Sequence, residues 1–401
     1  MPGSLSGRVQ KADLVAMTTS PLDRWQCPNI DLDPLLQWTR IIPSEKLALC
    51  GVHGTLFPRE LIRLTGARMV LTGEPESAGP DLVWALDGKI SLNDVPGLCR
   101  IENGQYFKNS PAPPCDLAAL PLPAYSLINP EPYSYELLGG KLALLETARG
   151  CPHRCSFCLK VMYGSQIRIK APGQVSSELE LVRRLGFGAV YFIDLEFTLF
   201  RDRTLELCKV IKDIGLPWCC QTRVDAVDPD LLAEMKKSGC KLIHYGIESG
   251  SPKTRELTHK FLSNTQIEQA IKWTREAGIA VAGFFLLGFP WETKSDIEET
   301  GRFARKLPLS YASFHHVTPY PGTSLAEDAS AVPWRNNPPD GRERRPDLTG
   351  LYLRFYLRPG YLVDSFCNHT DTRDAFHLFW NFLSGMRPAA RPSRNKVTRH
   401  E

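Results

Sequence analysis

Six apolar segments alternate with amphipathic helical segments between residues 141 and 330, and this alternation constrains the fold more than any other feature. The segments resemble buried parallel strands and lie at residues 142–147, 189–194, 217–222, 241–247, 280–288 and 312–320. Several intervening segments end in glycine, as helices often do. The pattern predicts an α/β fold, a (β/α)6 partial TIM barrel with its chemistry at the carboxyl ends of the strands. An open doubly wound sheet is compatible with the same alternation.

Three further apolar segments lie nearer the N-terminus, at residues 12–20, 46–55 and 68–76, with a short helix expected near residues 58–64. They predict three parallel strands with intervening helices, as in doubly wound α/β sheets. Because such sheets generally contain five or more strands, we expect an incomplete doubly wound domain. The proline-rich stretch at residues 109–132 is the clearest domain boundary in the chain.

These patterns divide the chain into five regions. We expect a partial α/β domain over residues 1–108, a linker over 109–140 and the barrel over 141–330. A polar loop at residues 333–347 leads into a C-terminal extension over 331–386, in which residues 351–362 and 375–386 are candidate helices. The basic residues 387–401 are expected to form a disordered tail.

Composition excludes several classes of protein. Hydrophobic residues make up 43% and charged residues 23% of the 401 residues, as in ordinary soluble globular proteins. The chain lacks an apolar run long enough for a transmembrane helix, and its first residues lack the apolar core of a secretory signal. The net charge of +4 is small for this length. We therefore expect a cytoplasmic protein without membrane or nucleic-acid partners.

Three of the twelve cysteines stand close together in the segment RGCPHRCSFC, with the spacing C-x3-C-x2-C. Cys151, Cys155 and Cys158 follow the first expected barrel strand, so they lie in a loop at its carboxyl end. Three thiolates at this spacing can hold three irons of a 4Fe–4S cluster. The fourth iron then has an open position where an exchangeable molecule can bind.

Zinc binding and core packing are the alternatives for this triplet. A structural zinc site needs a fourth ligand, and His153 lies within the loop. No second C-x2-C pair occurs elsewhere, and Cys219 and Cys220 should point to opposite faces of a strand. Packing alone rarely produces so tight a cysteine cluster. An iron–sulfur cluster is therefore the favoured interpretation.

The triplet, with Phe157 before its last cysteine, resembles the cluster loop of the radical S-adenosylmethionine (SAM) superfamily. Four later segments resemble further motifs of that superfamily in the same order, at residues 190–199, 244–251, 283–293 and 318–323. The resemblance covers roughly residues 142–325. It implies a 4Fe–4S cluster and SAM as cofactors, and reductive cleavage of SAM to a 5′-deoxyadenosyl radical.

The resemblance also nominates residues that bind SAM. It implies that Asp194, and less strongly Glu196, lies near the SAM amino group. Glu248 and Ser249 are placed near the ribose, and Gly288 belongs to the glycine-rich strand that the adenine approaches. Each has a simpler alternative: Asp194 can cap a helix and Gly288 can serve a turn. Arg223 can pair with the SAM carboxylate or with a neighbouring aspartate, Asp225.

The N-terminal piece resembles the later half of the cobalamin-binding domain in one branch of that superfamily, as do residues 120–125 and 351–362. Many members of the branch transfer a methyl group from methylcobalamin to an unactivated carbon or phosphorus. The early strands and the axial-histidine segment of that domain are absent, and His53 does not stand in that segment's place. Gly51, Gly54 and Gly73 would let backbone approach a corrin, or serve as ordinary turns.

The sequence therefore predicts a radical SAM enzyme, most simply a cobalamin-dependent methyltransferase. The expected partners are a small-molecule or natural-product substrate and a one-electron reductant such as flavodoxin or ferredoxin. One alternative is a cobalamin-independent radical SAM enzyme for oxidation, cyclisation or rearrangement. A non-catalytic zinc or iron–sulfur protein and an inactive fragment of a longer enzyme are the others.

Overall fold

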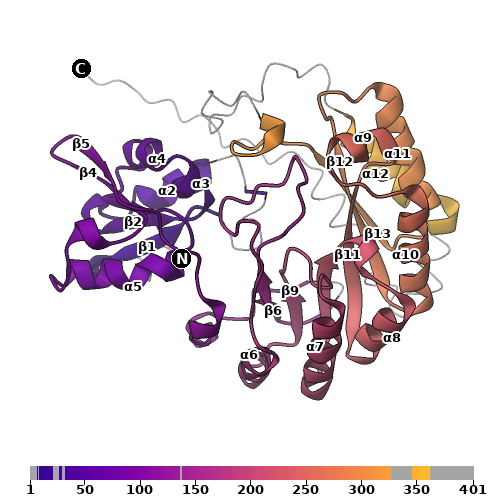
Figure 1. Cartoon of the computed structure of the whole chain (residues 1–401), viewed down its shortest axis with the longest axis horizontal. Helices are drawn as coiled ribbons and strands as arrows, with labels where there is room; N and C mark the ends of the chain where they lie inside the picture. Colours follow the sequence, from indigo (N-terminus) through magenta and orange to yellow (C-terminus); the bar gives the residue numbers. More distant parts are fainter. Residues whose placement is uncertain are drawn as a thin grey trace.

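The computed structural model describes residues 7, 9–20, 27–28, 32–135, 138–326 and 346–361 (Figure 1). Within these residues an N-terminal α/β domain lies beside a larger curved sheet that is covered by helices on its outer side (Figure 1). The two parts are connected through the proline-rich linker.

The N-terminal sheet has five strands in the order β1-β2-β3-β4-β5. The strands are β1 (Val15–Thr18), β2 (Leu47–Cys50), β3 (Met69–Leu71), β4 (Leu98–Glu102) and β5 (Gln105–Lys108). The first three are parallel, which confirms the three predicted parallel strands. The antiparallel β4–β5 hairpin was not predicted, although Asn103 and Gly104, with φ of 50° and 80°, form the Asn-Gly turn that favours a hairpin.

Helices cover both faces of this sheet because alternate strand residues point to opposite sides. The helices are α2 (Asp33–Thr39), α3 (Val52–Leu56), α4 (Pro58–Thr65) and α5 (Pro75–Leu86). Leu49 packs in one apolar cluster with Leu61 of α4, while Met69 packs in the other with Leu82 of α5. The N-terminal domain is therefore a small three-layer α/β unit.

The second sheet has six parallel strands in the order β13-β12-β11-β10-β9-β6. They are β6 (Leu142–Leu145), β9 (Ala189–Phe192), β10 (Trp218–Thr222), β11 (Cys240–Glu248), β12 (Ala280–Leu287) and β13 (Tyr311–His316). The spatial order follows the chain order, without the reversal that a doubly wound sheet requires. The predicted (β/α)6 partial barrel is therefore confirmed, and the open doubly wound alternative is wrong.

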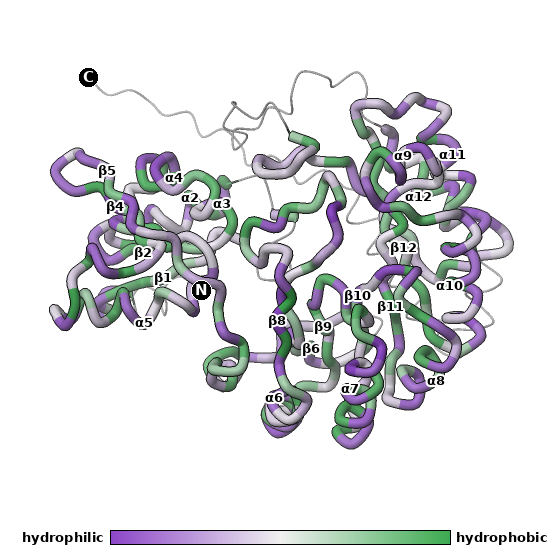
Figure 2. The backbone as a smooth tube through the Cα atoms, viewed as in Figure 1, coloured by the Kyte–Doolittle hydropathy of each residue, from purple (hydrophilic) through white to green (hydrophobic). Residues whose placement is uncertain are grey.

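The barrel helices pack on the outer face of this sheet (Figure 1). They are α6 (Pro172–Arg184), α7 (Arg201–Ile214), α8 (Pro229–Lys237), α9 (Pro252–Leu257), α10 (Asn264–Glu276) and α11 (Lys294–Lys306). Cys220 packs in this core, whereas Cys219 belongs to a separate cluster with Tyr135 and Tyr191. The two cysteines thus point to opposite faces, as predicted. In Figure 2 the strands are mostly hydrophobic and the outer helices carry hydrophilic stripes.

The linker packs against the barrel. The Tyr125 hydroxyl donates to the Leu144 carbonyl at 2.6 Å, and the Gln174 amide donates to the Leu117 carbonyl at 2.8 Å. Tyr135 reaches further and contacts His244 of β11 at 3.0 Å. These contacts fix the path of the chain between the two sheets.

The edge strand β13 is covered by α12 (Leu348–Tyr356), which contains part of the first predicted closing helix. The hydroxyl of Tyr352 bonds to the backbone of Phe314, and that of Tyr356 bonds to the backbone of Ala312. Backbone groups at the sheet edge thereby gain partners. The second predicted helix, at residues 375–386, and the basic tail lie outside the described residues.

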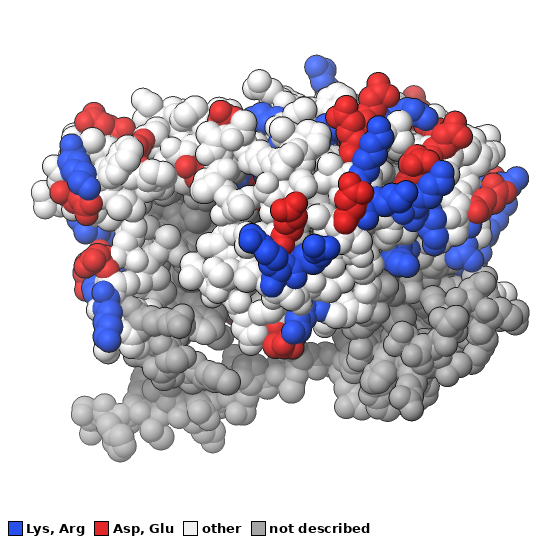
Figure 3. Space-filling model, turned by 90° about the horizontal axis from the view of Figure 1, so that it is seen from below, with Lys and Arg blue, Asp and Glu red and all other residues white. Residues whose placement is uncertain are grey.

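Among the helices in the described ranges, none is both long and apolar enough to cross a membrane. Lysine and arginine side chains are interspersed with acidic ones on the face seen in Figure 3.

Arg255 of α9 is a charged side chain that is fully buried in the barrel, with 0% of its surface exposed. Its guanidinium donates to the Leu262 carbonyl at 2.7 Å, and also to the Ser249 carbonyl and the Asn264 side chain. Burial lowers its pKa to about 10. The arginine thus ties the turn after β11 to the start of α10.

We expect Arg255→Met to lower the free energy of unfolding of the metal-free protein by about 3 kcal/mol, because buried acceptors lose their donors. Chemical denaturation followed by circular dichroism measures this loss. Arg201→Met is the matched control, since its pair with Asp228 is 47% and 37% exposed, and it should cost much less stability than Arg255→Met. Equal losses in the two variants would contradict the structural role of Arg255.

Candidate functional site

The three cysteines of the triplet lie in a loop at the carboxyl end of β6. A two-stranded antiparallel ladder, β7 (Ala148–Arg149) with β8 (Arg168–Ile169), forms the base of this loop. Gly150 has a φ of 94°, and a Cβ there would collide with the Gln166 carbonyl. Only glycine therefore lets the chain turn at this point and bring Cys151 into the loop.

All three sulfurs are free thiols of intermediate exposure. Burial raises the pKa of Cys158 to about 12, and the neighbouring Cys151 and Cys155 add to the rise. The three groups therefore lie within electrostatic reach of one another. Such thiols become thiolates when a metal ion replaces the proton, so the donor set suits a thiolate-bound metal centre.

A single metal ion and a cubane cluster make different demands on these residues. In the parts of the chain that the structure describes, no three His, Cys, Asp or Glu side chains converge where one ion could be held. A 4Fe–4S cluster does not require such convergence, because each cysteine binds a different iron. The loop therefore fits the predicted cluster by its free thiols and their mutual proximity.

Charged side chains from three strand ends gather beside the loop. His153 contacts Glu196 at 2.7 Å, and the Arg223 guanidinium donates to both oxygens of Asp225 at 2.8 Å. Burial raises the pKa of Glu196 to about 7, although Arg223 opposes the rise. Cys155 also favours the charged form of Arg223. Glu196 and Arg223 were both predicted from the sequence, and the fold brings them together.

Glu248 ends β11 in a strained conformation, with a φ of 68° at a register shift in the ladder with β12. Positive φ is unfavourable for residues other than glycine. Its carboxylate pairs with the Lys260 ammonium at 3.1 Å, and both side chains are buried. Burial opposes the charge on Lys260, but Glu248 and Cys155 outweigh it and raise the lysine pKa.

Asp194 makes its contacts within the protein. Its carboxylate accepts from the Thr147 amide at 2.5 Å, from the Ala148 amide at 3.2 Å and from the Thr147 hydroxyl. Burial raises its pKa to about 6 despite these donors. Asp194 therefore fixes the start of β7, which leads into the cysteine loop, and it caps no helix.

Ser249 and Gly288 also serve their own turns. The buried Ser249 hydroxyl contacts Thr300 at 3.0 Å and accepts from the Ser251 amide at 3.1 Å. Gly288 has a φ of 90°, and its amide donates to the Glu292 carboxylate at 2.7 Å. These two residues thus shape the strand ends on either side of the site.

Lys260 and His244 were missed by the sequence reasoning. Lys260 follows α9 in a segment without a motif, so only the fold places it against Glu248. Burial lowers the pKa of His244 to about 4, which keeps the ring neutral. Its Nδ1 therefore donates to the Cys220 carbonyl at 3.2 Å, and its Nε2 accepts from Tyr135 at 3.0 Å. The Phe284 ring stacks on the His244 ring, and the two ring centroids are 5.4 Å apart.

The N-terminal domain meets the cysteine loop through the carboxyl ends of its parallel strands. Val52, just after β2, packs in one apolar cluster with Leu159 and Met162 of the loop. The Thr55 hydroxyl donates to the Met162 sulfur at 3.3 Å. The edge that carries nucleotides and other cofactors in α/β sheets is therefore directed at the barrel site.

The three glycines of this edge differ in role. Gly51 has a φ of 94°, and a Cβ there would lie 2.9 Å from the Thr18 hydroxyl. Gly54 is constrained by packing, because its Cβ would lie 2.9 Å from Val70. Gly73 has a φ of 78° with nothing within 4 Å of its Cβ position. Gly51 and Gly73 are thus turn glycines at the edge, and Gly54 is a packing glycine.

The cysteine loop lies within the part of the chain that matches known proteins. The family model described as "Radical SAM superfamily" matches residues 145–304. An uncharacterized methyltransferase of Pyrococcus horikoshii is 32% identical over 341 residues, covering 80% of this chain and 74% of the relative. An anaerobic magnesium-protoporphyrin IX monomethyl ester cyclase of Cereibacter sphaeroides is 30% identical over 300 residues, covering 72% of this chain and 49% of that protein.

A solved structure shares the fold of most of the chain. It is the radical SAM methyltransferase TsrM of Kitasatospora setae with cobalamin and a 4Fe–4S cluster bound, with a TM-score of 0.65 and 17% identity. The match covers 80% of this chain and 65% of that one. Several curated relatives are considerably longer than the matched region, which spans only 49–61% of their length.

Asp194 allows a test by pH. Because its folded pKa of about 6 lies above the ordinary 3.8, the fold favours the neutral carboxyl. The contribution of this carboxyl to the free energy of unfolding is complete below about pH 4. It is lost as the pH rises through about 6, and the loss amounts to at most about 3 kcal/mol.

Asp194→Asn lacks this titration, so its stability relative to the native protein should increase between pH 4 and 7. Denaturant titrations of both metal-free proteins across this range measure the difference. A difference that stays constant with pH would mean that the carboxylate is ionised throughout.

Proposed function

The chain belongs to the radical SAM superfamily, and we propose that it is a cobalamin-dependent methyltransferase that acts on a small molecule. One observation carries the cobalamin part of the proposal: the strand-end edge of the N-terminal domain packs directly on the cysteine loop through Val52 and Met162. A corrinoid held at that edge would lie next to the cluster and SAM. The name of the Pyrococcus relative and the cobalamin bound in TsrM support the same activity.

In this proposal Cys151, Cys155 and Cys158 would hold a 4Fe–4S cluster, and SAM would bind beside it. When bound, the cluster would supply the electron for reductive cleavage of SAM, and the corrinoid would serve as the carrier of the methyl group. The free, partly exposed thiols support these ligand roles. The apolar cluster around Leu159 and Met162 limits the access of water from the N-terminal side.

The charged residues beside the loop orient and balance this centre. We assign Lys260 and Arg223 the role of offsetting the negative charge of the thiolates, since Cys155 favours the charged form of both. Glu248 holds Lys260 in place at 3.1 Å and is itself available at the strand end for a polar group of SAM. Asp194, Ser249 and Gly288 act through the backbone turns that they stabilise.

A second function has one specific observation in its favour. The Cereibacter relative is named as a cyclase, so ring formation without methyl transfer is the principal alternative. A one-electron reductant such as flavodoxin or ferredoxin, and a cytoplasmic location, belong to both versions of the proposal.

Replacing Cys155 with alanine should abolish SAM cleavage, because one iron loses its thiolate. Anaerobically reconstituted protein is incubated with SAM and dithionite, and 5′-deoxyadenosine is quantified by mass spectrometry. Cys27→Ala, which alters an exposed cysteine outside the loop, is the control and should retain activity. Full cleavage by the Cys155 variant, or bound zinc in place of iron in the native protein, would contradict the cluster assignment.

The corrinoid is tested separately. The reconstituted protein, exposed to hydroxocobalamin and desalted, should retain about one corrinoid per chain by absorbance if the N-terminal edge is its binding site. Turnover should give S-adenosylhomocysteine as well as 5′-deoxyadenosine, since SAM also remethylates the carrier. If 5′-deoxyadenosine forms without retained corrinoid or S-adenosylhomocysteine, the cobalamin-independent alternative is correct.

A further inference from the structure

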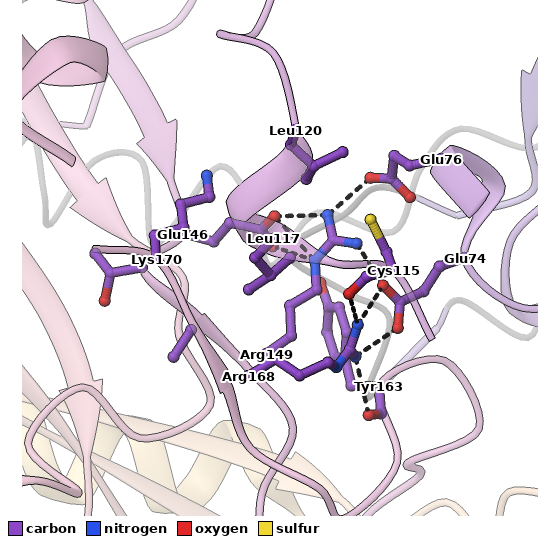
Figure 4. Close-up of polar contacts among 12 residues, drawn as sticks. Glu74, Glu76, Cys115, Leu117, Leu120, Glu146, Arg149, Tyr163, Arg168 and Lys170 are labelled. Atoms are coloured by element: carbon purple, nitrogen blue, oxygen red, sulfur yellow. Dashed lines mark hydrogen bonds and ion pairs between the residues drawn. The ribbon is translucent and has the colours of Figure 1, made fainter. Parts of the chain in front are cut away.

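Five charged side chains are gathered where the N-terminal domain meets the cysteine loop (Figure 4). Glu74 and Glu76 come from the start of α5, Glu146 follows β6, and Arg149 and Arg168 belong to β7 and β8. None of the five has a role in the proposed chemistry. Glu74, Glu146 and Arg149 are buried, and the number of contacts in the network points to a specific task.

Glu74 contacts both arginines of this network. Its Oε2 lies 2.6 Å from Arg149 Nη1 and 2.9 Å from Arg168 Nη1, while its Oε1 lies 2.5 Å from Arg168 Nη2. The Glu74 side chain is only 3% exposed. Both carboxylate oxygens are thus used, and the contact with Arg168 is bidentate, which fixes direction as well as distance.

The two arginines stand opposite each other in the ladder between β7 and β8. Like charges directly opposite each other repel, so this pairing requires a counter-charge. Glu146 and Glu76 supply one to Arg149, at 2.5 Å and 2.7 Å. For Arg168, Glu74 is the acidic partner that the described contacts provide. The spacing at the base of the loop therefore depends on a carboxylate from the other domain.

Both arginines also touch the far end of the loop. The Arg149 guanidinium lies over the Tyr163 ring, 5.7 Å from its centroid, and Arg168 Nη2 donates to the Tyr163 carbonyl at 3.3 Å. Arg149 is two residues before Cys151, and Tyr163 is five residues after Cys158. The network thereby holds the chain on both sides of the three cysteines.

We infer that Glu74 is a positioning residue for the cysteine loop: through Arg149 and Arg168, the N-terminal domain sets the arrangement of Cys151, Cys155 and Cys158. The inference rests on the proposed function in one respect, that these cysteines hold the cluster. It makes the N-terminal domain a part of the cluster site, whether or not that domain holds a corrinoid. A displacement of α5 would be transmitted directly to the loop.

The test is Glu74→Gln in the full chain, because the amide keeps the size of the side chain and removes its charge. In the metal-free protein, alkylation of the three cysteines by iodoacetamide is mapped by peptide mass spectrometry and referred to the exposed Cys27. We expect the three rates to rise roughly fivefold, since the loop opens more readily. In the reconstituted protein, the electron paramagnetic resonance spectrum of the reduced cluster should change in shape.

Two control variants separate positioning from general stability. Glu102→Gln removes a 2.7 Å pair with Arg100 in the same domain, away from the loop, and should leave rates and spectrum unchanged. Glu76→Gln removes one contact of Arg149, and its side chain is 30% exposed. Glu76→Gln should also raise the alkylation rates of the three cysteines, by a smaller factor than Glu74→Gln. If Glu74→Gln does not fold, the rates in Glu76→Gln test whether the network positions the loop.

The inference is wrong if Glu74→Gln lowers the melting temperature but leaves the alkylation rates and spectrum equal to those of Glu102→Gln. In that case the network only fastens the two domains together. The alkylation assay uses neither SAM nor a cluster. A native protein that fails to cleave SAM would therefore contradict the proposed function, while the effect of Glu74 on the thiols would still be measured.

Discussion

The parallel pairing of β6, β9, β10, β11, β12 and β13 in chain order is the constraint on which the site depends. Parallel strands in one sheet present all their carboxyl ends at one edge, and a right-handed helix returns the chain between them. The cysteine loop after β6, Glu196 after β9, Arg223 after β10 and Glu248 at the end of β11 consequently meet. A polar site is thus assembled from segments far apart in the sequence.

Burial of charge is the second organising feature of this edge. Isolated buried charges are strongly disfavoured, and three of the charges at this edge have an oppositely charged partner: Lys260 with Glu248, Arg223 with Asp225, and Arg149 with three glutamates. Because the hydrogen bonds in these pairs are directional, they restrict the positions of the paired side chains more than apolar contacts would. The arginine network extends the same principle across the boundary between the domains, so that the loop and α5 share one set of contacts.

Much of the fold could be predicted because its signals are local. Strand and helix periodicity gave the six barrel strands and the three parallel strands of the first domain, and C-x3-C-x2-C identified the loop. The β4–β5 hairpin was predictable from Asn103 and Gly104 but was overlooked. Glu196 and Glu248 were found through resemblance to family motifs, and Arg223 through its position just after the third expected barrel strand. Motif position did not reveal that Asp194 binds the Thr147 and Ala148 amides, because those donors lie some 46 residues earlier.

The sequence by itself determined the alternation of strands and helices and the spacing of the three cysteines, because each depends on neighbours within a few residues. Tertiary structure alone decided that Lys260 meets Glu248, that Tyr135 reaches His244, and that Glu74 bridges Arg149 and Arg168. The physical reason is that a buried charge or polar group takes whichever partner the packing of distant segments brings within hydrogen-bond distance. Such a choice leaves no periodic or local pattern in the chain.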